Sequence, residues 1–207
     1  MTKTIQNISE CRKLIRKVNE QVRKANEAGE YTYADAEREG KIKIDKDGNI
    51  DCNKLGLTSL KGAPEVVRGD FSCGSNYLTS LEGAPKEVGG GFYCYKNNLT
   101  SLDGAPKEIG GDFNCSENNL TSLKGAPEII EGYFDCYKNN LASLEGAPEI
   151  IEGYFDCSNN KLTSLKGAPK EVGRYFDCSH NDLKETPEEI EADLRKISDI
   201  EGKIYIK

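Results

Sequence analysis

The sequence predicts a repeat solenoid in which one short parallel β-strand per turn forms a curved sheet on the concave face, opposite an irregular, extended convex side. Three observations support this prediction. A 21-residue unit occurs six times over residues 57–182. All six phenylalanines of the 207-residue chain stand two residues before a cysteine, which puts both side chains on one face of a strand. An asparagine follows each of those cysteines by three residues, where the strand should end.

Each repeated position predicts a structural role. Residues 141–161, LASLEGAPEIIEGYFDCSNNK, show the unit. Its Phe, its Cys, an Ile or Val and two leucines should form one continuous core when the turns stack. The Asn side chain can bond backbone groups of its own turn and the next. The GAP triplet disfavours a helix, so the return limb should be extended or irregular.

The repeated cysteines are expected to be packing residues. Neighbouring parallel strands lie closer than a disulfide prefers, no C-x-x-C pair occurs, and the chain has one histidine, His180. No general base accompanies the thiols, and apolar burial raises the pKa of a thiol. We therefore expect free, buried thiols with no metal, cofactor or catalytic role in this column: Cys52, Cys73, Cys94, Cys115, Cys136, Cys157 and Cys178.

The motif F-x-C-x-x-N-x-L-x-x-L, present at residues 155–165, resembles the leucine-rich repeat pattern L-x-L-x-x-N-x-L. The 21-residue length and the proline in the return limb are similar to the short repeats of bacterial type III secreted effectors and of bacteriophage-encoded repeat proteins. The resemblance covers residues 50–187 and implies a solenoid whose concave strands bind another protein. The ubiquitin-ligase domain of such effectors has no counterpart in these 207 residues, so no enzymatic activity is expected.

Three regions are predicted along the chain. Residues 1–40 should form an N-terminal helical cap, because apolar residues recur at helical spacing over residues 5–25 and TYADAERE, residues 32–39, can add a second helix. Residues 41–182 should form the leucine-rich repeat solenoid, which begins with a hairpin that turns at Asp47 and Gly48. Residues 183–207 should form a degenerate repeat, with Lys196 in the cysteine position, and a final capping strand.

The residues beside Phe and Cys should point out of the core, and they vary between repeats. A tyrosine column precedes Phe in the last three units, and an aspartate column follows it. Tyrosine is common in protein-binding hot spots, although duplication alone could also have copied these residues. The candidate partner-binding residues are Tyr93, Tyr95, Tyr133, Asp135, Tyr137, Tyr154, Asp156, Tyr175 and Asp177.

Charge and hydropathy narrow the function further. Residues 1–40 carry 8 basic and 7 acidic groups, so the net charge of −8 lies on residues 41–207, which argues against direct nucleic-acid binding. No apolar run is long enough for a membrane span, and a cytoplasmic location is expected. The prediction is a non-enzymatic module that binds a protein with a basic or mixed surface, such as a phage-encoded inhibitor or adaptor of a bacterial host immune protein. The alternative is an acidic mimic of nucleic acid that occupies a basic groove.

Overall fold

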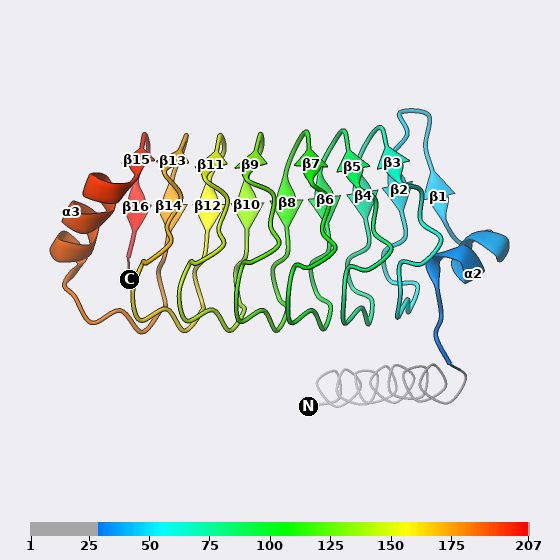
Figure 1. Cartoon of the computed structure of the whole chain (residues 1–207), viewed down its shortest axis with the longest axis horizontal. Coiled ribbons are helices and arrows are strands. Elements are labelled where there is room, and N and C mark those ends of the chain that lie inside the picture. Colours follow the sequence, from blue (N-terminus) through cyan, green and yellow to red (C-terminus); the bar gives the residue numbers. More distant parts are fainter. Residues whose placement is uncertain (1–28, 207) are drawn as a thin grey trace, which may run out of the picture.

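The structure, a computed structural model, describes residues 29–206 as a parallel β-solenoid of about six turns (Figure 1). Its first sheet has nine strands in the order β1-β2-β4-β6-β8-β10-β12-β14-β16. All neighbours are parallel except the antiparallel pair β1 and β2. The strands are β1 (Lys43–Ile44), β2 (Ile50–Asp51), β4 (Phe71–Ser72), β6 (Phe92–Tyr93), β8 (Phe113–Asn114), β10 (Phe134–Asp135), β12 (Phe155–Asp156), β14 (Phe176–Asp177) and β16 (Ile204–Tyr205).

The return limb is extended, as expected, but it forms a second parallel ladder and is not irregular. In-register turns bring the backbone groups of the extended limbs to strand spacing, so these groups pair. The ladder is interrupted once, between β7 and β9. Its two parts are β3 (Val66–Val67), β5 (Glu87–Val88) and β7 (Glu108–Ile109), and then β9 (Ile129–Ile130), β11 (Ile150–Ile151), β13 (Glu171–Val172) and β15 (Asp199–Ile200).

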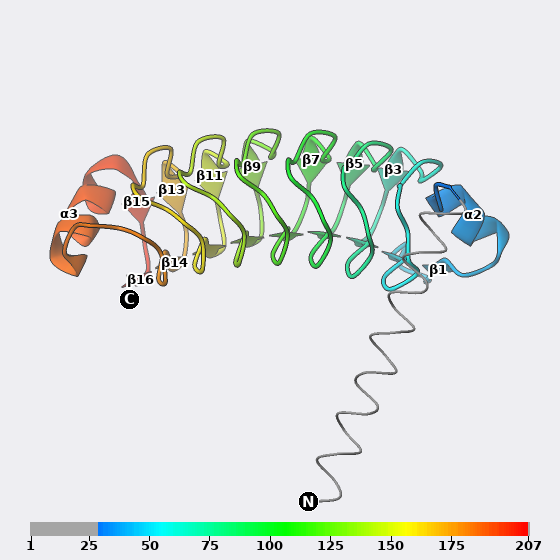
Figure 2. The same ribbon diagram turned by 90° about the horizontal axis from the view of Figure 1, so that it is seen from below.

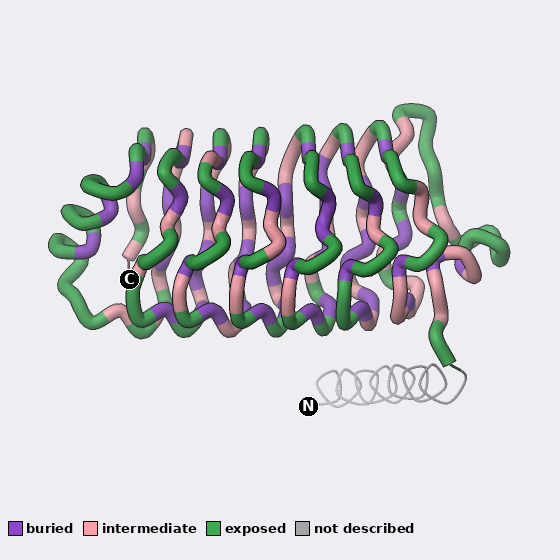
Figure 3. The backbone as a smooth tube through the Cα atoms, in the orientation of Figure 1, coloured by how far each residue is buried: buried purple, intermediate pink, exposed green. Residues whose placement is uncertain are grey.

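The core lies between the two sheets, as the repeated columns predict. All six phenylalanines and the seven cysteines of residues 52–178 are buried, and these cysteines are free thiols. Each Phe pairs in register with the Phe of the next turn, for example Phe134 with Phe155. Figure 3 shows stretches of buried residues that recur in successive turns. The side chains of one column thus pack on one another along the whole solenoid.

The predicted asparagine ladder is present in every repeat. In Asn118, Oδ1 accepts a hydrogen bond from the N–H of Leu99, at 3.0 Å. Its Nδ2 donates to the carbonyls of Cys94 and Cys115, both at 3.1 Å. One buried side chain therefore satisfies backbone groups of two successive turns, which fixes their register.

The glycine of each GAP triplet is required by the backbone. Gly83 has φ of 84°, and a Cβ there would lie 2.9 Å from the backbone nitrogen of Lys61 in the preceding turn. The following Ala84 N–H donates to the carbonyl of Leu81, at 2.9 Å. The triplet is therefore a tight turn between the LTSL segment and the return limb.

The N-terminal end of the described chain carries a short helix and the expected hairpin. Helix α2 (Tyr33–Arg38) begins at the N-cap Thr32, and the buried Tyr33 ring stacks on Phe71 at 6.2 Å. In the hairpin, Lys43 pairs with Asp51. The predicted helix over residues 5–25 lies outside the described residues.

The C-terminal end differs from the predicted degenerate repeat. Helix α3 (Pro187–Ile197), capped by Thr186, covers the last turn with Ile190 and Leu194 buried (Figure 1). The return then resumes, and Ile204 pairs with Phe176, 28 residues earlier instead of 21. Lys196 therefore lies in the helix and not in the cysteine position, because the inserted helix shifts the repeat by seven residues. Figure 2 shows the whole row of turns as a gently bowed array with α2 and α3 at opposite ends.

Candidate protein-interaction surface

The candidate residues lie on the outer face of the first sheet. Each strand buries its Phe, so the residues on either side of that Phe point away from the core. All nine predicted residues are half-buried there, which leaves part of every side chain accessible. The structure therefore places them on one face of the solenoid, in three neighbouring columns.

The tyrosine column before Phe forms a stacked ladder. The rings of Tyr133 and Tyr154 are 4.6 Å apart at an interplanar angle of 6°, and those of Tyr154 and Tyr175 are 4.7 Å apart at 4°. This spacing matches the distance between neighbouring strands. Because the ring faces cover one another, the ladder presents ring edges and hydroxyl groups to its surroundings.

Tyr205, which was not predicted from the sequence, packs against the end of this ladder from the neighbouring column, where it pairs in register with Asp177. Its ring meets Tyr175 edge-on, with centroids 5.6 Å apart and an interplanar angle of 88°. The side chain is 45% exposed. The signal was present, because IEGKIY at residues 200–205 matches IEGYFD at residues 151–156, but the inserted helix hid the register.

The aspartate column after Phe has a structural role as well as a charge. Asp135, Asp156 and Asp177 each accept a hydrogen bond through Oδ1 from the N–H two residues later, at 2.9 Å. Such Asx turns end the strand. In Asp156 the same oxygen also accepts from the Ser158 hydroxyl, at 2.6 Å. One carboxylate oxygen of each aspartate is thus already used by the fold.

Burial on this face changes the acidity of Asp135 and Asp156. Burial, supported by the nearby carboxylate of Asp156, raises the pKa of Asp135 to about 6, against the lowering effect of the Tyr137 N–H. Burial also raises the pKa of Asp156, against the hydrogen bonds from Ser158 and together with the charge of Asp177. The column therefore holds negative charge at neutral pH at a cost that a cationic partner would relieve.

The tyrosines of the first repeats lie apart from the ladder. Tyr95 covers Gly74, where a Cβ would come within 2.6 Å of the ring. Tyr93 covers Gly91 in the same way, and its hydroxyl donates to Asp112 Oδ2 at 3.3 Å. Tyr137 lies in the column of Tyr95, two turns along, with Ser116 between them. The face thus has a tyrosine ladder in its C-terminal half, with Tyr93 and Tyr95 before the ladder and Tyr137 beside it.

The described part of the chain shows neither a cluster of metal ligands nor a membrane-spanning helix. Residues 29–206 contain no group of three or more His, Cys, Asp or Glu side chains placed to hold a metal ion. None of the helices in this range is long and apolar enough to cross a membrane. Comparison with known protein families, with characterised proteins and with solved structures found no match.

Proposed function

We propose that this protein is a non-enzymatic binding module of the leucine-rich repeat kind, whose first-sheet face is a concave surface that grips another protein. The observation that carries the proposal is the ladder of three parallel tyrosine rings beside an in-register aspartate column. Rigid tyrosines lose little conformational entropy on binding and offer both apolar area and hydroxyl groups. The ladder is already ordered before a partner arrives.

The negative charge of this face favours a partner with basic groups on its surface. Asp135, Asp156 and Asp177 lie in one row, and residues 41–207 carry a net charge of −8. A protein with a basic or mixed surface would relieve the repulsion within this row. The resemblance to bacteriophage-encoded repeat proteins leads us to propose an inhibitor or adaptor of a bacterial host protein, such as an immune component, acting in the host cytoplasm.

A nucleic-acid mimic is the second candidate, and the regular row of carboxylates favours it. A mimic would depend on charge, whereas a hot-spot binder would depend on the tyrosines. The two therefore predict different responses to salt and to substitution.

A comparison of the wild-type protein with two triple variants distinguishes these two candidate functions. Wild type, a Tyr133→Phe/Tyr154→Phe/Tyr175→Phe variant and an Asp135→Asn/Asp156→Asn/Asp177→Asn variant would each capture proteins from a bacterial lysate. The affinity of a captured protein would then be measured by calorimetry at low and high salt. The tyrosine variant keeps the stacked rings and removes only the hydroxyls, so we expect a loss of about tenfold or more in affinity with modest salt dependence.

Tyr77→Phe is the matched control, because it removes a half-buried tyrosine hydroxyl outside the ladder. Unchanged capture by both triple variants would count against this face as the site. Steep salt dependence with loss only in the aspartate variant would favour the mimic.

A further inference from the structure

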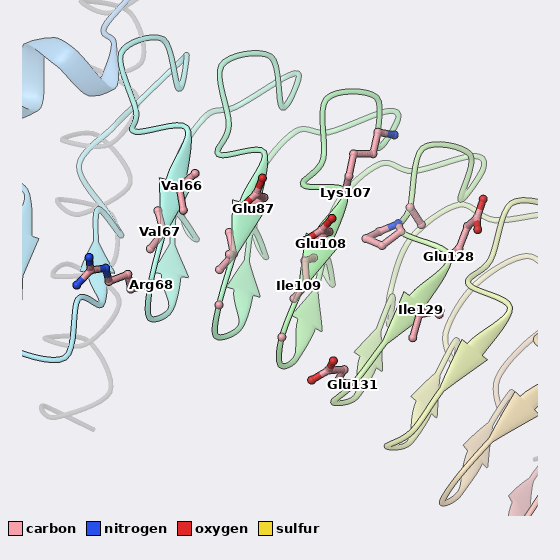
Figure 4. Close-up of a pocket in the computed structure, with 15 residues that line it drawn as sticks. Val66, Val67, Arg68, Glu87, Lys107, Glu108, Ile109, Glu128, Ile129 and Glu131 are labelled. Carbon is pink, nitrogen blue, oxygen red and sulfur yellow. The ribbon is translucent and has the colours of Figure 1, made fainter.

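The second sheet carries a groove at the point where its ladder is interrupted. A hollow of about 840 Å³ lies over β3, β5, β7 and β9 (Figure 4). On both sides of the break the ladder is bonded normally, as in Gly110 N to Val88 O at 2.9 Å and Glu152 N to Ile130 O at 3.0 Å. Within residues 29–206, the corresponding N–H of Glu131 has no such bond. The break falls where the repeats change from GG to EG after the strand.

The groove combines exposed apolar side chains with unpaired acidic ones. Val66 and Ile129 are 57% and 52% exposed at its two ends. Between them, Glu87 and Glu108 are in-register neighbours on β5 and β7, and like charges so placed repel each other. Neither carboxylate has an ion-pair partner among the described residues. A ligand for this groove should therefore bring apolar groups and cations together.

Among the described residues of the return limb, the oppositely charged neighbours that flank the break form no ion pair. Lys86 pairs with Glu65 at 2.6 Å and Lys170 with Glu149 at 2.7 Å, each across one 21-residue step. Lys107 and Glu128 are related by the same step across the break, and in the described structure no ion pair joins them. The lining of the groove contains two cationic side chains, Arg68 and Lys107, and four carboxylates, Glu87, Glu108, Glu128 and Glu131.

Residues 1–28 of the same chain have the complementary chemistry. They hold seven basic and three acidic residues, a net charge of +4, whereas the net charge of −7 for the whole chain leaves −11 for residues 29–207. Six of the basic residues alternate with apolar ones between residues 11 and 25. Twenty-eight residues span roughly 42 Å as a helix, against roughly 14 Å for the three strand spacings from β3 to β9.

The place where the described chain begins also favours this segment. Tyr31 donates its N–H to Thr58 Oγ1 in the first turn, at 2.8 Å. A smaller cavity beside α2, lined by Tyr33 and Glu37, shares Val66 and Arg68 with the groove. The buried Tyr33 hydroxyl has no hydrogen-bond partner among residues 29–206. The segment that precedes Gly29 therefore joins the solenoid beside α2, at the same end of the row of turns as β3, where the groove begins (Figure 1).

We propose that residues 1–28 of this chain bind across the second-sheet groove, with apolar side chains against Val66 and Ile129 and basic side chains against Glu87 and Glu108. This contact is intramolecular and lies on the opposite sheet from the tyrosine ladder. It does not depend on the binding function proposed above.

Cys11 gives a direct test in the full-length chain. The other seven cysteines are buried, so a nitroxide spin label can be attached to Cys11 alone. We expect the label to broaden the amide signals of the groove residues Gly89, Gly110 and Ile129 in dilute protein, and far less those of the tyrosine ladder. Salt at about 1 M should weaken the effect, since it screens exposed charges.

A Glu87→Lys/Glu108→Lys variant should reduce this broadening severalfold. Glu152→Lys/Glu171→Lys is the matched control, because it makes the same charge change at two exposed positions on the far part of the same sheet. An NMR spectrum of each variant checks the fold. Absence of broadening at the groove in wild type, its appearance at the tyrosine ladder, its dependence on protein concentration, or equal effects of the two variants would overturn the proposal.

Discussion

The ring of Tyr154 lies parallel to that of Tyr175, with centroids 4.7 Å apart and an angle of 4° between the planes. Tyr133 covers the other face of Tyr154 at 4.6 Å. Tyr154 is thus held between two rings that the repeat itself supplies. This relationship makes the outer face of the first sheet an ordered surface.

Removing the central ring should destabilise the solenoid. Each aromatic pair contributes about 0.5–1.5 kcal/mol beyond its burial, so Tyr154→Ala, which loses two pairs, should lower the free energy of unfolding by about 1–3 kcal/mol. Tyr154→Phe keeps both pairs and should stay within about 0.5 kcal/mol of wild type. Urea unfolding followed by circular dichroism measures both, and equal stabilities would show that the stack contributes nothing.

Each asparagine of the ladder should contribute more to the free energy of unfolding than a stacked tyrosine does. Asn118→Ala leaves the Leu99 N–H and the Cys94 and Cys115 carbonyls without their side-chain partner, so a loss of about 2–4 kcal/mol is expected. Asn119→Ala is the control, because Asn119 is the exposed neighbour. Chemical denaturation compares the two variants, and a similar small effect in both would contradict the role of the ladder.

Asp135 should make stability depend on pH. Its pKa rises from an ordinary 3.8 to about 6 in the folded chain, so the folded state holds the proton more tightly than the unfolded state. Stability contributed by this group is therefore present below pH about 4 and falls as pH rises towards about 6. Asp135→Asn should flatten this fall and be more stable than wild type at pH 7 by on the order of 1–2 kcal/mol.

Urea midpoints at pH 4, 5, 6 and 7 measure the effect of Asp135. Asp51→Asn serves as the control, since Asp51 is the exposed residue at the same position of an earlier turn and accepts the same kind of bond, from Asn53 N–H. A wild-type curve that runs parallel to that of Asp135→Asn would show that Asp135 titrates normally.

The thiols should be protected in the folded protein. Burial raises the pKa of five thiols well above that of a free thiol: Cys73, Cys94, Cys115, Cys136 and Cys157. It raises the pKa of Cys52 and Cys178 to about 12. With a colorimetric thiol reagent, at most one of the eight cysteines should react promptly, and all eight after unfolding in urea. Prompt reaction of two or more would contradict the buried column.

The break in the second sheet should appear in hydrogen exchange. The N–H of Glu152 is bonded to Ile130, whereas that of Glu131 has no ladder partner within residues 29–206. Glu131 should therefore exchange faster than Glu152 by about tenfold or more, measured by NMR. Equal protection of the two amides would indicate that the ladder is continuous in solution.

The repeat made much of the fold predictable. Six copies place Phe155, Cys157 and Asn160 at the same positions in successive turns, so each position can be assigned a role from its column. The buried Phe and Cys columns, the asparagine ladder and the hairpin at Asp47 and Gly48 are confirmed. The short helix expected within residues 32–39 is confirmed as well, over Tyr33–Arg38 with Thr32 as its N-cap.

The features that were not predicted depend on contacts between turns. The pairing of the return limb could not be predicted from the sequence, because two-residue strands such as Val66–Val67 have no recognisable pattern of their own. The repeat was also expected to continue through Lys196, although Thr186, Pro187 and Glu189 form the start signal of a helix. That error concealed Tyr205. The turn made by Asp156 with Ser158 was likewise taken only as surface charge.

The sequence alone determined that the chain is a parallel solenoid with Phe and Cys inside, because period-2 alternation in every copy leaves only one way to bury both columns. Only the tertiary structure decided that Tyr133, Tyr154 and Tyr175 stack face to face, that Tyr205 packs against the end of this ladder, and that the second ladder is interrupted between Ile109 and Ile130. These features depend on the distance and angle between successive turns. No single repeat encodes that geometry, since it arises when whole turns pack against each other.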